Sequence, residues 1–413
     1  MILMNLESRT RATLFRLAAI WFGTLVALLL ARLLLVRVND PRHVSLLRAY
    51  QAQRLYFETD PTLGVVRRRN LDFRYRFREH PTGYVHFVSN NQGLRRFGPT
   101  RYERDPKLKR VLVLGDSHFD GFVNEHENFT YLLEASLKSR GAPHPAEVLN
   151  ASLGSYSPLQ SFLWYERTGH KFHPEIILFT FYLGNDLSDL MTPGARPTLD
   201  VGKDGRQWKV RPPDTLRLGA SGIGRLERLH LRLVSEGVLY PLVYSLVGSY
   251  PGWFPPQGQA ASICGGCLGQ SLGQIRWSKT GPVDEALSVF TLILERFETL
   301  AAERRARLIL LLLPTRLEVE PARDSQRIAA VRRLLSLTSE DLAFETSLRR
   351  ALKRIAVRQG VAVIDLFDPL SQSSGPTYWD SDWHLNVQGH RVVAECLLDR
   401  LFPLEPPAAR SPW

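Results

Sequence analysis

Apolar positions between residues 108 and 402 follow two alternating patterns. Continuous apolar runs, typical of strands covered on both faces, occur at 111–115, 147–152, 175–183, 307–314 and 361–366. Stretches with apolar residues every three or four positions predict helices at 128–140, 158–172, 284–305, 341–359 and 387–402. Strands and helices that alternate in this way form a parallel sheet with helices on both faces. The pattern predicts one α/β domain at 108–402 with a five-stranded, doubly wound parallel sheet.

Two segments precede or interrupt this alternation. Residues 41–107 combine turn signals with short alternating runs, which predicts a small β-rich lead-in where FRYRFR at 73–78 is one amphipathic strand. Residues 190–280 are rich in Gly, Pro, Ser and Trp, which predicts an insertion after the third strand with one helix pair around 222–249. Residues 403–413 form a Pro-rich tail.

The first 40 residues have the composition of a membrane-spanning segment. From Ala12 to Val36 the only charged residues are Arg16 and Arg32, and an apolar helix of this length spans a bilayer. The run is long and lacks a small-residue cleavage site, so an uncleaved signal anchor is favoured over a cleaved signal peptide. Arginines flank both ends, so the positive-inside rule leaves the orientation open, and an exported domain follows only from function.

Composition and charge narrow the classes of protein. Among 413 residues, 44% are hydrophobic and 23% are charged, which is typical of a globular chain. The net charge is +12, and residues 41–110 hold sixteen Lys or Arg against six Asp or Glu. This basic segment is either a solvated face or a surface for anionic lipid headgroups or an acidic glycan. No nucleic-acid-binding module accompanies the charge, so nucleic acid is not an expected partner.

Polar residues with catalytic chemistry follow the carboxyl ends of several predicted strands, where parallel sheets bind ligands. Ser117 follows the first strand, Gly154 and Ser155 follow the second, and Asn185 follows the third. Asp382 and His384 follow the fifth.

These residue types together meet the needs of serine catalysis. A serine nucleophile requires a base, a carboxylate that orients the base, and donors for the developing oxyanion. His384 is the candidate base and Asp382 the carboxylate. The Ser117 N–H, an N–H of the 154–155 turn and the Asn185 amide are the candidate donors.

The motifs GDS at 115–117, the Gly-containing turn after Asn150, GND at 184–186 and DWH at 382–384 resemble the SGNH/GDSL hydrolase superfamily. DPTLG, NNQGLR, SYSP and HLN-x-x-GH further resemble its membrane-anchored bacterial branch of polysaccharide O-acetylation and esterase proteins. The resemblance implies a flavodoxin-like three-layer α/β/α fold and ester or acyl chemistry without metal or cofactor. Carried over residue by residue, it implies nucleophile Ser117, base His384, acid partner Asp382 and oxyanion residue Asn185.

The chain departs from that family pattern at two positions. Many members have Asp three residues before the histidine, where this chain has Ser381. A two-residue spacing occurs in the polysaccharide O-acetylation branch that the chain resembles, so Asp382 is favoured over Asp380 as the partner of His384. The family's oxyanion glycine aligns with Ser155, and Gly154 stands one residue early, so either N–H fits the role.

Several neighbouring residues have structural interpretations. Asp116 is expected to cap the following helix, and His118 and His390 are expected to pack rather than react. Cys264 and Cys267, in CGGC, are expected to form a disulfide if the domain is exported, and two free thiols if it is not.

Three functions fit these observations. The first is a serine esterase or deacylase acting on an acylated carbohydrate or lipid at the cell envelope. The second is an O-acyltransferase using the same site, with a sugar hydroxyl in place of water, alongside envelope polysaccharide-modification partners. The third is an idle scaffold that binds a glycan or an envelope assembly. The expected location is the bacterial inner membrane, with the domain outside the cytoplasm.

Overall fold

The structure is a computed structural model. It describes residues 2–37, 55–139, 145–194, 196–202, 208–214, 267–323, 325–380 and 382–403, together with 229, 232–234 and 240.

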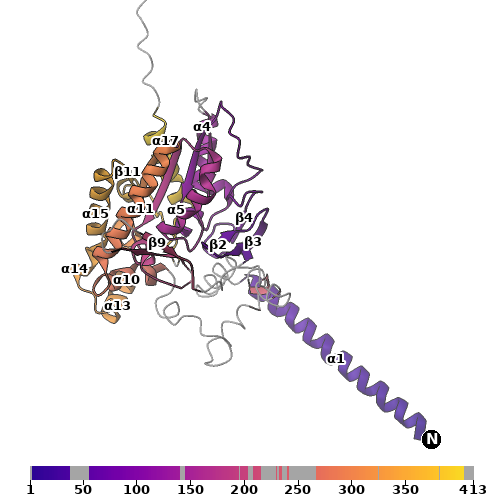
Figure 1. Ribbon diagram of the computed structural model, residues 1–413. Coiled ribbons are helices and arrows are strands. Elements are labelled where there is room, and N and C mark those ends of the chain that lie inside the picture. The colour runs from indigo at the N-terminus through magenta and orange to yellow at the C-terminus, as the bar shows by residue number, and fades with distance from the viewer. Residues whose placement is uncertain are drawn as a thin grey trace, which may run out of the picture.

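A five-stranded parallel sheet forms the centre of the molecule (Figure 1). Its strands are β5 (Lys109–Leu114), β6 (Ala146–Asn150), β7 (Ile176–Tyr182), β10 (Arg307–Leu313) and β11 (Ala362–Asp365). They lie in the order β11-β10-β7-β5-β6, and every neighbouring pair is parallel. This is the flavodoxin-like order, whose reversal beside β5 marks the ligand-binding edge. The predicted doubly wound fold is confirmed.

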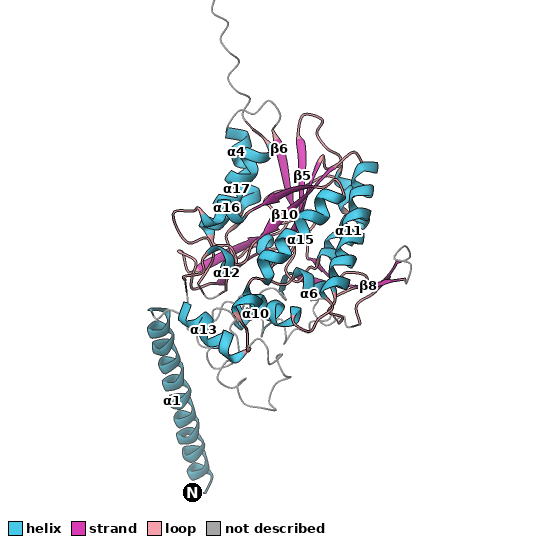
Figure 2. Ribbon diagram, turned by 90° about the vertical axis from the view of Figure 1, so that its left-hand side faces the viewer, coloured by secondary structure: helices cyan, strands magenta, loops and turns pink. Residues whose placement is uncertain are grey.

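Alternate residues of each strand face two separate hydrophobic clusters. Leu112 and Leu114 of β5 point into one cluster, and Val111 and Val113 point into the other. The first cluster is covered by α5 (Pro158–Arg167), α11 (Val283–Glu303) and α15 (Phe344–Arg358), and the second by α4 (Phe129–Ser139), α16 (Phe367–Ser371) and α17 (Val387–Leu401). Figure 2 shows α4, α16 and α17 on one side of the sheet and α11 and α15 on the other. The strands are continuously apolar because both faces are covered.

Shorter elements complete the domain. They are α3 (Ser117–Asp120), η1 (Glu125–Glu127), η2 (Gly169–Phe172), α6 (Asp186–Leu190), β8 (Thr198–Val201), β9 (Trp208–Arg211), α10 (Cys267–Ser278), α12 (Arg316–Val319), α13 (Ser325–Leu334) and α14 (Ser339–Leu342). The β8–β9 hairpin and α10 lie within the predicted 190–280 insertion. Most of the helix pair expected around 222–249 lies outside the described residues.

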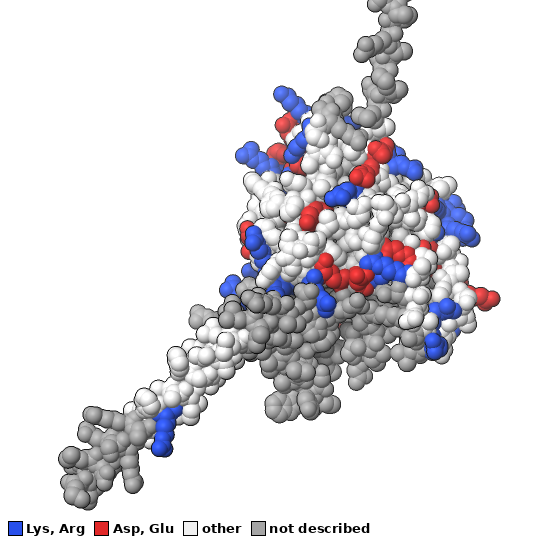
Figure 3. Space-filling model, turned by 180° about the vertical axis from the view of Figure 1, so that it is seen from behind, with Lys and Arg blue, Asp and Glu red and all other residues white. Residues whose placement is uncertain are grey.

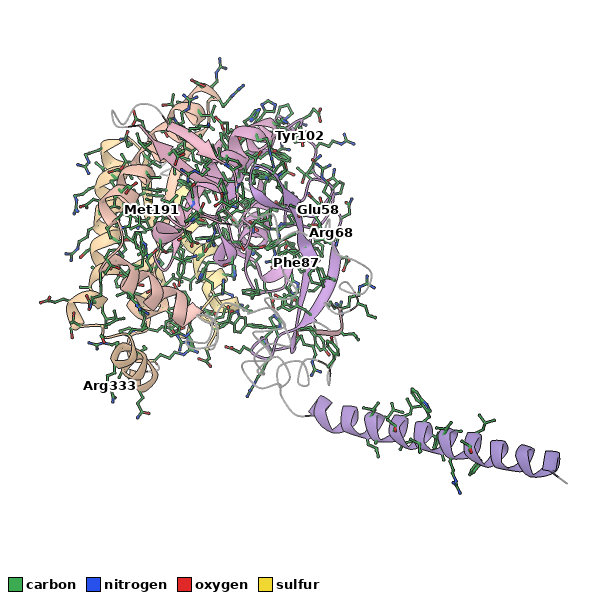
Figure 4. All side chains as sticks on the ribbon, turned by 60° about the horizontal axis from the view of Figure 1, so that its bottom comes forward. Glu58, Arg68, Phe87, Tyr102, Met191 and Arg333 are labelled. Atoms are coloured by element: carbon green, nitrogen blue, oxygen red, sulfur yellow. The ribbon has the colours of Figure 1, made fainter. Side chains whose placement is uncertain are left out.

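The lead-in forms two antiparallel hairpins that pack into the first cluster. β1 (Phe57–Asp60) pairs with β2 (Gly64–Arg67), and β3 (Asp72–Arg76) pairs with β4 (Tyr84–Val88). The rings of Tyr56 and Phe87 stack with centroids 4.4 Å apart, and both belong to the cluster that contains Leu112. Figure 4 shows Glu58 on β1, Arg68 just beyond β2 and Phe87 on β4 in the same part of the domain. The lead-in therefore shares its hydrophobic core with the sheet.

The first helix, α1 (Ile2–Arg37), contains an apolar window at Thr13–Leu30 with a mean hydropathy of 2.0. The helix is long and apolar enough to cross a membrane as an anchor or to act as a signal sequence, and none of this window is buried against the domain. On the face of the domain shown in Figure 3, acidic and basic side chains of the described residues are interspersed.

The end of β5 approaches β7 closely at Gly115. A Cβ atom at this position would lie 1.7 Å from Thr180 Oγ1, so the chain can turn here only with glycine. This contact fixes where the chain leaves the sheet toward Ser117.

Gly115→Ala is expected to lower the free energy of unfolding by about 1–3 kcal/mol, because the added methyl overlaps the Thr180 side chain. Denaturant unfolding of the full chain in detergent measures the change. Gly375→Ala is the matched control, since a Cβ there has no neighbour within 4 Å. Equal stability of the two variants would contradict the close approach.

Candidate active site

Ser117 is the first residue of α3, directly beyond the carboxyl end of β5. Asp116 is the N-cap, and its carboxylate accepts a hydrogen bond of 3.0 Å from the His118 N–H, as the capping interpretation expected. Gly121, with φ +80°, ends the helix after one turn. Ser117 itself is half-buried.

The structure brings three predicted residues together through hydrogen bonds. His384 Nε2 lies 2.7 Å from Ser117 Oγ, and His384 Nδ1 bonds to Asp382 Oδ1. Both His384 and Asp382 are buried. They lie in the loop before α17, where Asn386 caps the helix by accepting from the Gly389 N–H at 2.9 Å. The residues that follow β5 and those in the loop between β11 and α17 thus meet, as expected at the carboxyl edge of a parallel sheet.

Asp380 has a different set of partners. Its carboxylate pairs with Arg323 and lies 3.7 Å from Arg316, and its side chain is 51% exposed. Of the two carboxylates weighed from the sequence, only Asp382 bonds to the histidine.

Aromatic rings hold His384 from two sides. The His118 ring stacks on it with centroids 4.1 Å apart, and the Phe122 ring meets it edge-on at 4.6 Å. The Tyr182 ring lies 3.7 Å beyond His118. Burial lowers the pKa of His118 well below its usual value, with a further contribution from His384, so His118 packs as a neutral ring. His118 therefore orients His384.

Backbone N–H groups at the site differ in their hydrogen bonding. The Gly154 N–H donates to Asp120 Oδ2 at 3.3 Å. The Ser117 and Ser155 N–H groups make no hydrogen bond among the described residues. Ser155 has φ +77°, a left-handed conformation that costs a non-glycine residue energy. Ser155, rather than Gly154, thus has an N–H available for a ligand.

Arg196 links the Ser155 turn to Asn185. Its Nε donates to the Ser155 carbonyl at 2.8 Å, and its Nη1 lies 3.1 Å from Asp189 Oδ1. Asp189 in turn accepts a hydrogen bond of 2.8 Å from Asn185 Nδ2. Gly184 permits this loop, since a Cβ there would lie 2.4 Å from the Tyr182 ring.

Arg67 and Arg95 of the lead-in form a buried network with Asp120, next to the turn that contains Gly154. Arg67 lies 2.9 Å from Asp120 and donates to the Ser152 carbonyl. Arg95 lies 3.5 Å from Asp120 and 3.1 Å from Glu125. Asp120 is thereby held by two cations while it fixes Gly154.

The sequence reasoning did not find Arg67, Arg95 or Arg196 as parts of the site. These arginines lie in a turn-rich lead-in and in the insertion, with no motif around them. The one available signal was the excess of basic residues at 41–110, which does not say which of them are buried.

Two acidic side chains near Ser117, Asp116 and Asp186, are buried. Burial raises the pKa of Asp116 to about 7, although His384 opposes this rise. Burial and the Asp116 carboxylate raise the pKa of Asp186, whose Oδ2 accepts the Tyr182 N–H at 2.7 Å. No group of three or more His, Cys, Asp or Glu is arranged to hold a metal ion in the described part of the chain.

The remaining predicted residues lie away from these contacts. His390 is buried on α17 and accepts from the Phe129 N–H at 3.3 Å, which is a packing role. Cys264 and the side chain of Cys267 lie outside the described residues, so their disulfide stays a prediction. Cys396 is half-buried on α17 beside the second cluster.

No protein-family model and no curated protein matches the chain. Among solved structures, it is similar to LAE5, an alpha/beta hydrolase enzyme from the metagenome of Lake Arreo (13% identity, TM-score 0.36), covering 74% of this chain and 100% of that one. It is also similar to a lipase/acylhydrolase from Enterococcus faecalis (11%, TM-score 0.35), covering 72% and 100%. A third is a catalytic mutant of an acetylxylan esterase from Geobacillus stearothermophilus (11%, TM-score 0.37), covering 71% and 94%. At this low similarity, the chemistry of the site follows from its own geometry.

The buried Asp116 carboxyl predicts a pH-dependent stability. Its folded pKa of about 7 lies well above the ordinary value of an aspartate carboxyl, so the folded state keeps a proton that the unfolded state loses. The contribution of this carboxyl to the free energy of unfolding is fully present below about pH 4 and is lost as the pH rises to about 7. The stability of Asp116→Asn, which keeps the cap, should therefore rise by about 3 kcal/mol relative to the wild type between pH 5 and pH 8.

Denaturant unfolding at both pH values measures this difference. Asp368→Asn, at an exposed carboxylate, is the control and should show no such trend. A constant difference between the Asp116→Asn and wild-type proteins across the pH range would contradict the burial argument.

Proposed function

We propose that the chain is a serine ester hydrolase that acts through an acyl-enzyme at Ser117. The observation that carries this proposal is the continuous hydrogen-bonded series Asp382–His384–Ser117, buried at the carboxylate and half-open at the serine. An idle scaffold does not need a buried imidazole aligned on a serine hydroxyl. The resemblance of GDS, GND and DWH to the SGNH/GDSL hydrolases supports the same chemistry.

In the proposed reaction, His384, Ser117 and Asp382 each act at a defined step. His384 Nε2 takes the Ser117 proton while Oγ attacks the acyl carbon, and Asp382 stabilises the imidazolium that forms. The proton then passes to the leaving alcohol. Water deprotonated by His384 attacks the acyl-enzyme, and the acid departs with Ser117 reprotonated.

The oxyanion is stabilised by three donors in this proposal. The free N–H groups of Ser117 and Ser155 are two of them, and the second N–H of the Asn185 amide is the third. Gly154 serves the turn instead, since its N–H is taken by Asp120.

The proposed substrate is an acylated carbohydrate or lipid at the cell envelope. The apolar α1 supports a membrane anchor, which we place in a bacterial inner membrane. The placement of the catalytic domain on the outer side follows from the proposed substrate and not from the helix. The basic lead-in that follows the anchor supports a setting near anionic envelope polymers or headgroups.

Ser117→Ala is expected to lower the hydrolysis rate of 4-nitrophenyl acetate by at least about 10⁴-fold and to abolish labelling by a fluorophosphonate probe. His384→Ala should be similarly inactive, because no other base lies within reach of the serine among the described residues. Spectrophotometric assay and in-gel labelling of the full chain measure both effects.

Ser139→Ala, at an exposed serine on α4, is the matched control and should keep full activity and labelling. Ser117→Ala protein that still hydrolyses the ester at the wild-type rate would overturn the assignment.

Arg196→Met is expected to lower kcat for the same ester by about 10–100-fold while KM changes little. The arginine positions the Ser155 turn and, through Asp189, the Asn185 amide, and these donors act in the transition state. Arg211→Met is the control, because Arg211 pairs with Asp200 on an exposed hairpin. A change in KM alone would instead place Arg196 in ground-state binding.

A further inference from the structure

The β3–β4 hairpin of the lead-in has one face in the core and one face in solvent. Tyr75, Val85 and Phe87 point into the core. Arg74 lies opposite His86, and Arg76 lies opposite Tyr84, on the other face. The outer face of this hairpin therefore carries two cross-strand pairs of a basic and an aromatic residue.

A cavity of about 630 Å³ opens over this face. It is lined by Arg74, Thr82, Tyr84, His86, Asn124 and His126. Asn124 is buried, and its side-chain oxygen accepts the His86 N–H at 2.7 Å, so the cavity wall is held in place. Arginine, two histidines and a tyrosine thus converge on one hollow.

Exposed aromatic rings continue from the cavity. Tyr84 is 46% exposed, Phe97 46% and Tyr131 43%. The Phe97 ring lies 6.3 Å from His86 on one side and 6.3 Å from Tyr131 on the other. We call the cavity and this row of rings the hairpin groove.

The charge of the hairpin groove is positive. Arg74 forms no ion pair within the described part of the chain, and Arg76 lies over the Tyr84 ring at 5.8 Å. The one carboxylate on this face, Asp72, is 2.7 Å from His86. A free guanidinium beside aromatic faces suits a carboxylate-bearing ligand.

We propose that the hairpin groove binds an acidic oligosaccharide. A sugar ring presents C–H groups on its faces and hydroxyls at its edges, so it stacks on exposed aromatic rings while polar groups bind its rim. Carboxylates on the sugar pair with Arg74, and the successive ring contacts from His86 through Phe97 to Tyr131 suit an extended chain.

The groove is separate from Ser117 but shares a support with it. At the hairpin turn, Glu79 accepts the Asp380 N–H, and the Phe77 ring lies 5.4 Å from Trp379. This is the loop that carries Asp382 and His384. A chain bound along the hairpin lies beside the catalytic loop, although binding itself does not depend on the proposed hydrolysis.

The test is a binding titration of the full chain in detergent with tetragalacturonate, and with neutral cellotetraose for comparison. We expect saturable binding of tetragalacturonate that weakens with salt, and weaker binding of cellotetraose. Tyr84→Ala and Arg74→Ala should each raise Kd at least about tenfold, whereas Tyr84→Phe, which keeps the ring, should bind like the wild type. Arg354→Ala, at an exposed arginine of α15, which lies at the opposite edge of the domain from β3 and β4 (Figure 1), is the control.

Absence of saturable binding, or equal weakening by Arg354→Ala, would overturn the proposal. Loss of binding to phosphatidylglycerol vesicles in Tyr84→Ala and Arg74→Ala, with tetragalacturonate binding unchanged, would make the groove a membrane contact instead. Aryl-ester hydrolysis should be unaffected in these variants. Wild-type protein that binds the glycan but hydrolyses no ester would refute the proposed function while leaving the groove in place.

Discussion

The buried pairing of Asp120 with Arg67 and Arg95 is the interaction on which the arrangement of the site depends. Asp120 ends the helix that begins at Ser117, and its other oxygen fixes the Gly154 N–H. Both arginines come from the lead-in, and all three side chains are nearly inaccessible to water. Removing one member of such a buried pair typically costs about 3–5 kcal/mol, because a charge is left uncompensated. The helix that begins at Ser117 and the turn that contains Gly154 are therefore fixed to each other through a segment outside the α/β sheet.

A second constraint is the packing of His384, the proposed catalytic base. His384 has a carboxylate at one nitrogen and the serine at the other, and rings on two sides limit its rotation. His118 is suited to this position because its burial keeps it neutral, so it adds no repulsion when His384 becomes cationic. A second protonated imidazole at this distance would oppose the proton transfer to His384 that the proposed mechanism requires.

The sequence predicted the alternating strands and helices of the α/β domain. Five strands and their helices appear within a few residues of their expected positions, because burial on both faces leaves a continuous apolar run that composition alone reveals. Ser117, Asp382 and His384 meet because they follow strand ends in one parallel sheet. Arg67 and Arg196 could not be predicted, since their roles depend on tertiary contacts more than 40 residues away and their types are ordinary on any surface. The short helices α12, α13 and α14 were also missed, because a few turns of polar helix carry little periodic signal.

The hydrogen bond between Ser117 and His384 joins residues that are 267 positions apart. During synthesis Ser117 therefore emerges long before the His384 imidazole. An incomplete chain thus carries a plain serine hydroxyl with no base to activate it. In the proposed mechanism Ser117 becomes reactive only once α17 has docked on the sheet, so long-range topology sets the moment at which the serine is activated.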